Sequence, residues 1–302
     1  MKKGKIITAS IIAAGTAAGI GYGLCRKKSN NTVREILIDG IPQKDDNALR
    51  IMSFNLRYRD DKGQLIKNRS KVVTAIIDQY APDSFGVQEA TGRWLDILGD
   101  SLGYKYAFVA TARDTKGYDA ERNAVFYLKD KYNLIDKGTI WLSETPDVPY
   151  TKSFDSNCHR IATWAVLENK ETGEKYTHLN THLDHILEST RVAQAKVLIE
   201  KLSQLQENGK AICTGDFNAD FTSDVYSDML KFTDDAKEIA QNSDQGITYH
   251  EYGNVSPDEY KGAIDHIFVP KQSKVTTYKV IRNRANGIYA SDHYPVVADI
   301  IG

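Results

Sequence analysis

Short apolar segments typical of β-strands follow one another through most of the chain, with few segments of helical spacing between them. Residues 48–57 and 210–218 have the pattern of strands, whereas residues 68–83 and 189–208 place apolar side chains at helical intervals. This mixture predicts a layered α/β fold built on mixed sheets. No shift in composition interrupts residues 48–302, so we expect them to form a single domain.

A segment without charged side chains lies near the N-terminus, over residues 6–25, and basic residues flank it on both sides. Twenty uncharged residues match the ~20 needed to cross the hydrocarbon core of a bilayer as a helix. We therefore expect residues 1–28 to be an N-terminal membrane anchor or a signal segment. The anchor is favoured because no A-x-A cleavage site precedes a polar start.

The location of the protein depends on which of these two interpretations holds. An anchor would attach the chain to the membrane by a single N-terminal helix, and we expect the catalytic domain to be extracytoplasmic. Removal of the segment would make the protein secreted. Residues 29–47 are polar apart from one short apolar run, which predicts a linker ahead of a domain over residues 48–302.

The charge of the chain is distributed unevenly. Residues 1–28 hold six of the 39 basic residues and none of the 40 acidic ones, so the rest of the chain has a net charge of −7. Broad attraction of nucleic acid requires a basic face. We therefore expect any phosphate-bearing substrate to be bound by a local site that includes a metal.

Polar side chains of the kinds that bind metals and move protons lie at or near the ends of several predicted strands. A single acidic residue in such a place is commonly a turn former or a helix cap, but a set can build one site. Carboxylate and amide oxygens suit Mg²⁺ or Mn²⁺, and an Asp–His pair suits a general base. Together these groups predict the hydrolysis of a phosphate ester. The set consists of Asn55, Glu89, His182, Asp184, His185, Asp216, Asn218, Asp265, His266, Asp292 and His293.

The ordered series MSFNLR, GVQE, ERNAVFY, NTHLDH, GDFN, IDHIF and SDHYPV resembles the endonuclease/exonuclease/phosphatase (DNase I-like) family over about residues 48–301. WLSETP and HRIATW are similar to a bacterial branch of that family with undefined substrates. The resemblance implies a four-layer α/β sandwich, with two mixed β-sheets flanked by helices, here preceded by the N-terminal hydrophobic helix. It also implies hydrolysis that depends on a divalent metal, Mg²⁺ or Mn²⁺.

The resemblance also implies a role for each matching residue. The metal ligands it indicates are Asn55, Glu89, Asp292 and Asp216. His293 would be the general base, and Asp265 would orient it. Asp216 and Asn218 would orient the attacking water and hold the phosphate.

Three further residues complete the predicted site. The resemblance implies that His182 contacts the scissile phosphate and that Glu121 donates or accepts a hydrogen bond to this histidine. From its chemistry, Arg160 is a candidate for binding substrate phosphate, because a guanidinium can contact two phosphate oxygens at once. An equally simple role for Arg160 is an ion pair or a cap at a strand end.

The expected function is hydrolysis of a small phosphomonoester, such as a sugar or inositol phosphate, by in-line attack of water activated by the Asp–His pair. The lack of a basic stripe and the WLSETP segment favour this substrate class. The alternative is an endonuclease or another phosphodiesterase acting on DNA, RNA or phospholipid. A more remote alternative is a phosphate-ligand binding protein without catalysis. We expect a membrane contact through residues 6–25 and no obligate protein partner.

Overall fold

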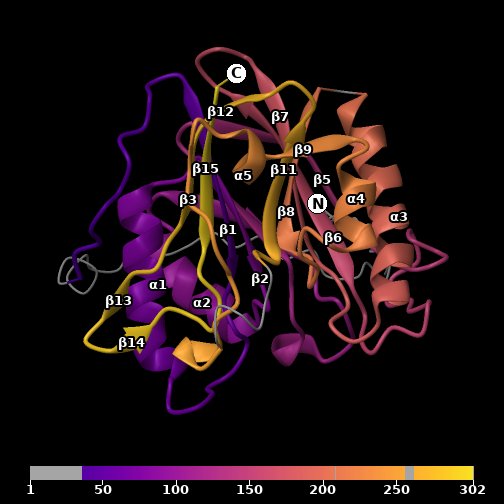
Figure 1. The fold of residues 1–302 in the computed structure, drawn as a ribbon, viewed down its shortest axis with the longest axis horizontal. Helices are drawn as coiled ribbons and strands as arrows, with labels where there is room; N and C mark the ends of the chain where they lie inside the picture. The colour runs from indigo at the N-terminus through magenta and orange to yellow at the C-terminus, as the bar shows by residue number, and fades with distance from the viewer. Residues whose placement is uncertain (1–35, 208, 256–261, 302) are drawn as a thin grey trace, which may run out of the picture.

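Two large mixed sheets form the centre of the computed structural model, which describes residues 36–207, 209–255 and 262–301 (Figure 1). In these residues the first sheet has seven strands in the order β10-β12-β15-β1-β2-β4-β3, and the second has six in the order β5-β6-β7-β8-β11-β9. The strands of the first sheet are β10 (Asn242–Ser243), β12 (Lys274–Val280), β15 (Val296–Ile301), β1 (Ala48–Asn55), β2 (Ser84–Gln88), β4 (Ala124–Leu128) and β3 (Tyr106–Val109). Those of the second are β5 (Tyr132–Trp141), β6 (Ile161–Asn169), β7 (Lys175–His182), β8 (Lys210–Asp216), β11 (Asp265–Pro270) and β9 (Thr233–Asp235).

Helices cover the outer face of each sheet, so the chain forms four layers (Figure 1). The first sheet packs on α1 (Ile66–Tyr80) and α2 (Gly92–Leu102), and the second packs on α3 (Glu188–Gln206) and α4 (Asp224–Met229). A short helix, α5 (Ala236–Ile239), two 3₁₀ turns, η2 (Gly117–Asp119) and η3 (Glu251–Gly253), and a small hairpin of β13 (Arg284–Ala285) and β14 (Ile288–Tyr289) complete the regular structure that is described. The predicted mixed α/β fold is confirmed, whereas the predicted N-terminal hydrophobic helix lies outside the described residues.

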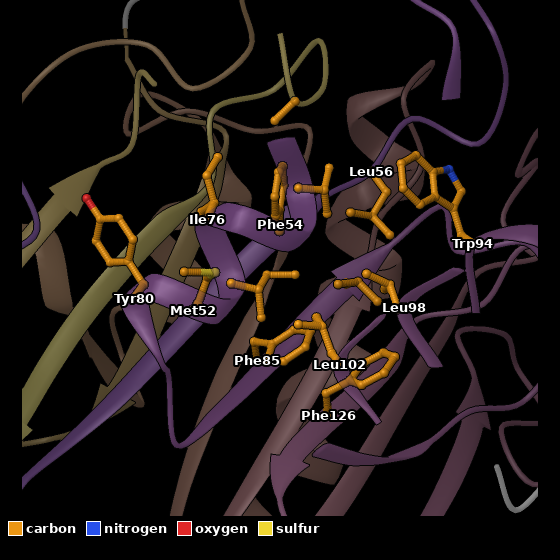
Figure 2. Close-up of a cluster of buried hydrophobic side chains, with 14 of the residues drawn as sticks. Met52, Phe54, Leu56, Ile76, Tyr80, Phe85, Trp94, Leu98, Leu102 and Phe126 are labelled. Carbon is orange, nitrogen blue, oxygen red and sulfur yellow. The ribbon is translucent and has the colours of Figure 1, made fainter. Parts of the chain in front are cut away.

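Strand β1 contributes side chains to the hydrophobic clusters on both faces of its sheet. Ile51 belongs to the cluster between the two sheets, whereas Met52 and Phe54 belong to the cluster under α1 and α2. Successive side chains of a strand point to opposite faces, so a strand buried on both faces has apolar side chains on each of them. Figure 2 shows the outer cluster, with Trp94 of α2 beside Leu56, the residue after β1.

The first long helix ends for a local reason. The helical pattern over residues 68–83 is observed as Ile66–Tyr80, because Ala81 adopts a left-handed conformation with φ 46° and ψ 55°. The N–H of Ala81 still bonds to the carbonyl of Ile77, which is the hydrogen bond of a left-handed helix cap. Pro82 follows and cannot extend the helix.

Residues 36–47 are packed against the domain, which corrects their prediction as part of a linker. Ile38 is buried, and its N–H donates to Gln79 Oε1 at 3.0 Å. The guanidinium of Arg50 donates to the carbonyl of Pro42 at 2.9 Å, and Lys44 pairs with buried Asp83. The folded unit therefore starts before residue 48. Across the described part of the chain, no helix combines the length and apolar character that crossing a membrane requires.

A buried amide joins the two sheets close to the ends of their central strands. Asn180 of β7 accepts hydrogen bonds through Oδ1 from Gln88 Nε2 at 2.7 Å and from Thr214 Oγ1 at 3.1 Å. Gly86 makes this approach possible, because a Cβ at that position would lie 2.4 Å from Asn180 Oδ1. Since buried polar groups need partners, these bonds fix β2, β7 and β8 relative to one another.

Candidate active site

The predicted site residues meet at one edge of the two sheets. Since β1 runs parallel to β2, and β7 parallel to β8, the carboxyl ends of each pair lie together. Strand β11 is antiparallel to β8 and places Asp265 opposite Asp216, and β15 is antiparallel to β1, so the residues just before β15 lie at the same edge. The topology thus gathers Asn55, Glu89, His182, Asp216, Asn218, Asp265, Asp292 and His293.

Asn55 connects the carboxylates contributed by the two sheets. Its Nδ2 donates to Glu89 Oε1 at 3.1 Å and to Asp216 Oδ2 at 2.9 Å. The other oxygen of Glu89 accepts from the backbone N–H of Tyr58 at 2.9 Å. Glu89 is 8% exposed and Asp216 is 1% exposed, so these hydrogen bonds are made away from bulk water. The predicted neighbours Asn55, Glu89 and Asp216 are therefore in direct contact.

Two residues of the site have backbone conformations that side chains rarely adopt. Glu89 has φ 59° and Asn218 has φ 48°. The left-handed region is tolerated by asparagine but is costly for glutamate, by on the order of 1 kcal/mol or more. Asn218 is held there by its N–H, which donates to Asp216 Oδ1 at 3.0 Å, and by its Nδ2, which donates to the Leu183 carbonyl at 3.1 Å.

His293 and Asp265 form the closest imidazole–carboxylate pair of the site. His293 Nδ1 donates to Asp265 Oδ2 at 2.8 Å, and His293 Nε2 lies 3.7 Å from Asp216 Oδ2. Burial opposes a charge on His293, but the carboxylates of Asp265 and Asp216 outweigh it and raise its pKa to about 10. The geometry leaves Nε2 as the ring nitrogen that can exchange a proton with a bound molecule.

Asp292 has an arginine neighbour that the sequence analysis did not identify. Its Oδ1 accepts from Ser291 Oγ at 3.0 Å, and its Oδ2 lies 3.5 Å from Arg57 Nε. The backbone N–H of Arg57 also donates to Asn55 Oδ1 at 3.0 Å. Arg57 lies two residues after Asn55 in MSFNLR, and this short separation is the sequence signal from which its place in the site could have been predicted.

The structure does not form the predicted hydrogen bond between Glu121 and His182. Glu121 Oε1 accepts from Arg113 Nη2 at 2.6 Å instead, and the backbone N–H of Arg113 donates to the carbonyl of Glu121 at 3.0 Å. His182 Nε2 lies 3.4 Å from Asp216 Oδ2, while its buried Nδ1 lacks a hydrogen-bond partner within the described residues. The backbone hydrogen bond brings Arg113 beside Glu121, which explains the different pairing.

Arg160 lies at the end of the second sheet, directly before β6. One of its nitrogens, Nη2, is 3.1 Å from His185 Nδ1. The side chain is buried, and its Nε and Nη1 have no hydrogen-bond partner in the described part of the chain. Among the described residues, Arg160 does not form an ion pair with an acidic residue, which was one of its two alternative roles.

The acidic residues of the site fit a hard divalent cation. Burial raises the pKa of Asp216 to about 6 and also raises the pKa of Asp292, although the positive charge of His293 acts in the opposite direction on both. Asp216, Asp265 and His293 offer ligand atoms that all lie within 4.8 Å of one another. Asp265 and His293 are hydrogen-bonded to each other, however, and Asp216 also accepts a hydrogen bond from the amide of Asn55. Carboxylate and amide oxygens suit Mg²⁺ or Mn²⁺. Asp216 can bind a cation together with Asp265 and His293 or together with Asn55.

Comparison with known proteins adds the following relationships. The model of the Endonuclease/Exonuclease/phosphatase family matches residues 52–293. The solved structure of an endonuclease/exonuclease/phosphatase from Bacteroides vulgatus is 31% identical, with 84% of this chain and 98% of that chain covered and a TM-score of 0.78.

Two further relatives are named by a specific enzymatic activity. A mannosyl-6-phosphatase from Bacteroides thetaiotaomicron is 30% identical, with 84% of this chain and 100% of that chain covered and a TM-score of 0.75. The Ccr4 exoribonuclease subunit of the Candida albicans CCR4-Not complex is 28% identical over 159 residues, which are 44% of this chain. The matched segment spans 20% of that protein.

Proposed function

The chain belongs to the endonuclease/exonuclease/phosphatase family, and on that premise we propose that it hydrolyses small phosphomonoesters such as sugar phosphates. Members of this family are hydrolytic phosphoesterases, either phosphatases or nucleases. The observation that carries the proposed chemistry is the hydrogen bond of 2.8 Å between His293 Nδ1 and Asp265 Oδ2, which leaves Nε2 free beside the buried carboxylates. This arrangement supports a histidine that removes a proton from water.

Two observations support the choice of a phosphomonoester. The similarity to the mannosyl-6-phosphatase extends over the whole length of the phosphatase. The similarity to the exoribonuclease subunit covers 20% of the length of that subunit. Residues 29–302 carry a net charge of −7, as expected for a protein that does not rely on broad attraction of nucleic acid. A nuclease is the second candidate, supported by the same exoribonuclease similarity.

In the proposed mechanism, the residues of the chain position the water and the phosphate. Asp265 keeps His293 Nδ1 protonated, so Nε2 accepts the proton of the water that attacks phosphorus. Asn218 has a second amide N–H beyond the one bonded to Leu183, and we assign it to a phosphoryl oxygen. His182 is assigned to another phosphoryl oxygen through its unpartnered Nδ1.

The proposed metal ligands are Glu89, Asn55, Asp292 and Asp216. When bound, a divalent cation supplies positive charge that stabilises the phosphoryl oxygens and favours the neutral form of His293. The carboxylates of Glu89 and Asp292 are assigned to it ahead of Asp265, because Asp265 is already bonded to His293.

Parallel assays of monoesters and diesters test the proposed substrate class. The purified full-length chain is incubated with Mg²⁺ and with mannose 6-phosphate, inositol monophosphate, bis(p-nitrophenyl) phosphate or supercoiled plasmid. We expect release of inorganic phosphate from the monoesters, with kcat/KM at least about tenfold higher than for the diester. Nicked plasmid without phosphate release from either monoester would contradict the proposal and favour the nuclease.

A further inference from the structure

Two nitrogens of the Arg160 guanidinium have no hydrogen-bond acceptor among the described residues. Its side chain is 5% exposed, and neither Nε nor Nη1 has a hydrogen-bond partner among the residues described. A buried N–H without an acceptor is destabilising, and more so when the group is charged. In native sites such groups are satisfied by a bound ligand, ion or water.

Arg113 is a second guanidinium that is held firmly and is incompletely paired. Its Nη2 donates to Glu121 Oε1 at 2.6 Å, while its buried Nε has no hydrogen-bond partner within the described ranges and lies 4.0 Å from Asp114 Oδ2. The carbonyl of Arg113 accepts from Trp141 Nε1 at 2.9 Å, which ties this loop to the end of β5. Glu121 thus acts on Arg113 as a positioning residue.

Backbone contacts place Arg160 beside the phosphate-contacting part of the proposed site. Thr181 Oγ1 donates to the carbonyl of Ile161 at 3.1 Å, and Ala162 pairs with Thr181 in the sheet. His182 therefore lies opposite Ile161, and Arg160 is the next residue outward, directly before β6.

Arg113 reaches the same place through its partner Glu121. The N–H of Ala90 donates to the carbonyl of Arg122 at 3.2 Å, so Glu121 lies beside the Glu89 segment. Asn123 Nδ2 donates to the carbonyl of Ile161 at 2.7 Å, which brings the same segment next to Arg160. Both arginines therefore lie along one side of the site, across from the His293–Asp265 pair.

We propose that Arg113 and Arg160 form a subsite for the terminal oxygens of a phosphomonoester dianion, an inference that rests on the proposed function. A monoester carries nearly two negative charges and three non-bridging oxygens, whereas a diester carries one charge and two such oxygens. Arg113 is paired with the carboxylates of Glu121 and Asp114, whereas Arg160 forms no ion pair among the described residues, so the charge of Arg160 is available for the additional charge of the monoester. The planar guanidinium of Arg160 has adjacent N–H groups that can contact the additional oxygen.

The proposal is tested with Arg160→Gln and Arg113→Gln in the full-length chain. The substrates are p-nitrophenyl phosphate and bis(p-nitrophenyl) phosphate, and the dissociation constant of inorganic phosphate is measured by calorimetry with Mg²⁺ present. We expect kcat/KM for the monoester to fall about ten- to hundredfold in Arg160→Gln, the loss typical of a charge-assisted hydrogen bond. We expect the diester value to change less than about threefold and phosphate binding to weaken by about tenfold or more.

Matched variants separate this subsite from a loss of charge or of folding. Lys271→Gln removes one positive charge from an exposed lysine that pairs with Asp234, and it should leave all three values unchanged. Arg160→Lys keeps the charge but loses the planar fork, so it should weaken phosphate binding less than Arg160→Gln. Arg113→Gln provides an independent test if Arg160→Gln does not fold.

The possible outcomes distinguish the subsite from the proposed function. Equal losses for monoester and diester, with phosphate affinity unchanged in both arginine variants, would overturn the subsite and leave the phosphatase assignment standing. A wild-type enzyme that hydrolyses the diester more efficiently than the monoester would overturn the proposed function itself.

Discussion

Replacing His293 by glutamine lowers kcat for phosphate-ester hydrolysis by about 10²- to 10⁴-fold, the range that a general base contributes. Glutamine fills much of the same space, but its amide cannot take the proton that Nε2 takes from water. Because His293 is oriented by Asp265, the variant Asp265→Asn should also lose activity, through a weaker base and altered tautomer preference. The measurement is kcat at saturating substrate and Mg²⁺.

A neighbouring histidine provides the matched control for His293→Gln. His266 follows Asp265 in the chain, but it faces away from the site, with Nδ1 3.1 Å from Asp235 Oδ2 and Nε2 3.0 Å from the Ala219 carbonyl. Its replacement by glutamine should lower the free energy of unfolding without an effect on kcat of the folded enzyme. If His293→Gln retained wild-type kcat while folded, the assignment of the base would be wrong.

Replacing Glu89 by glutamine should remove most of the metal binding and lower kcat by at least about 10²-fold. Both oxygens of Glu89 accept hydrogen bonds, from Asn55 Nδ2 and from the Tyr58 N–H, so the carboxylate is held at a fixed place. A glutamine there removes the negative charge and turns one acceptor into a donor that faces another donor. Titration with Mn²⁺, followed by calorimetry, measures the binding without reference to activity.

Glu121 is the control for this metal experiment, because it is a second glutamate near the site with a different partner. Its carboxylate pairs with Arg113, so Glu121→Gln should retain the Mn²⁺ affinity of the wild type. Treatment of the wild type with a chelator should abolish hydrolysis, and added Mg²⁺ should restore it. Unchanged Mn²⁺ affinity in Glu89→Gln would show that the cation is bound by other residues.

Much of the fold could be predicted because the spacing of apolar residues within short segments indicates its strands and helices. The short apolar run of β1 and the helical spacing before Pro82 are properties of neighbouring residues. The packing of residues 36–47 could not be predicted in this way, since it depends on Gln79 and Asp83, which are distant in the sequence. The predictions for residues 1–28, including a membrane contact and an extracytoplasmic domain, concern residues that the structure does not describe, and they stay predictions.

The site could be predicted as a set of residues but not as a set of contacts. Asn55, Asp216 and Asp265 lie at strand ends, and the strand topology alone places these ends at one edge of the sheets. Their residue types and positions were therefore sufficient to predict them as site residues. The pairing of Glu121 with Arg113 depends on how a loop returns to the sheet, and no local pattern specifies that. Side-chain partners in loops are therefore the part of the site that needed a structure.

The stereochemical course at phosphorus tests direct attack by water most directly. A sugar 6-phosphorothioate made chiral with ¹⁸O is hydrolysed in H₂¹⁷O, and the configuration of the released thiophosphate is determined. A single in-line displacement by the water that His293 activates predicts inversion of configuration. Retention would require two displacements through a phosphorylated side chain, and it would contradict the proposed mechanism.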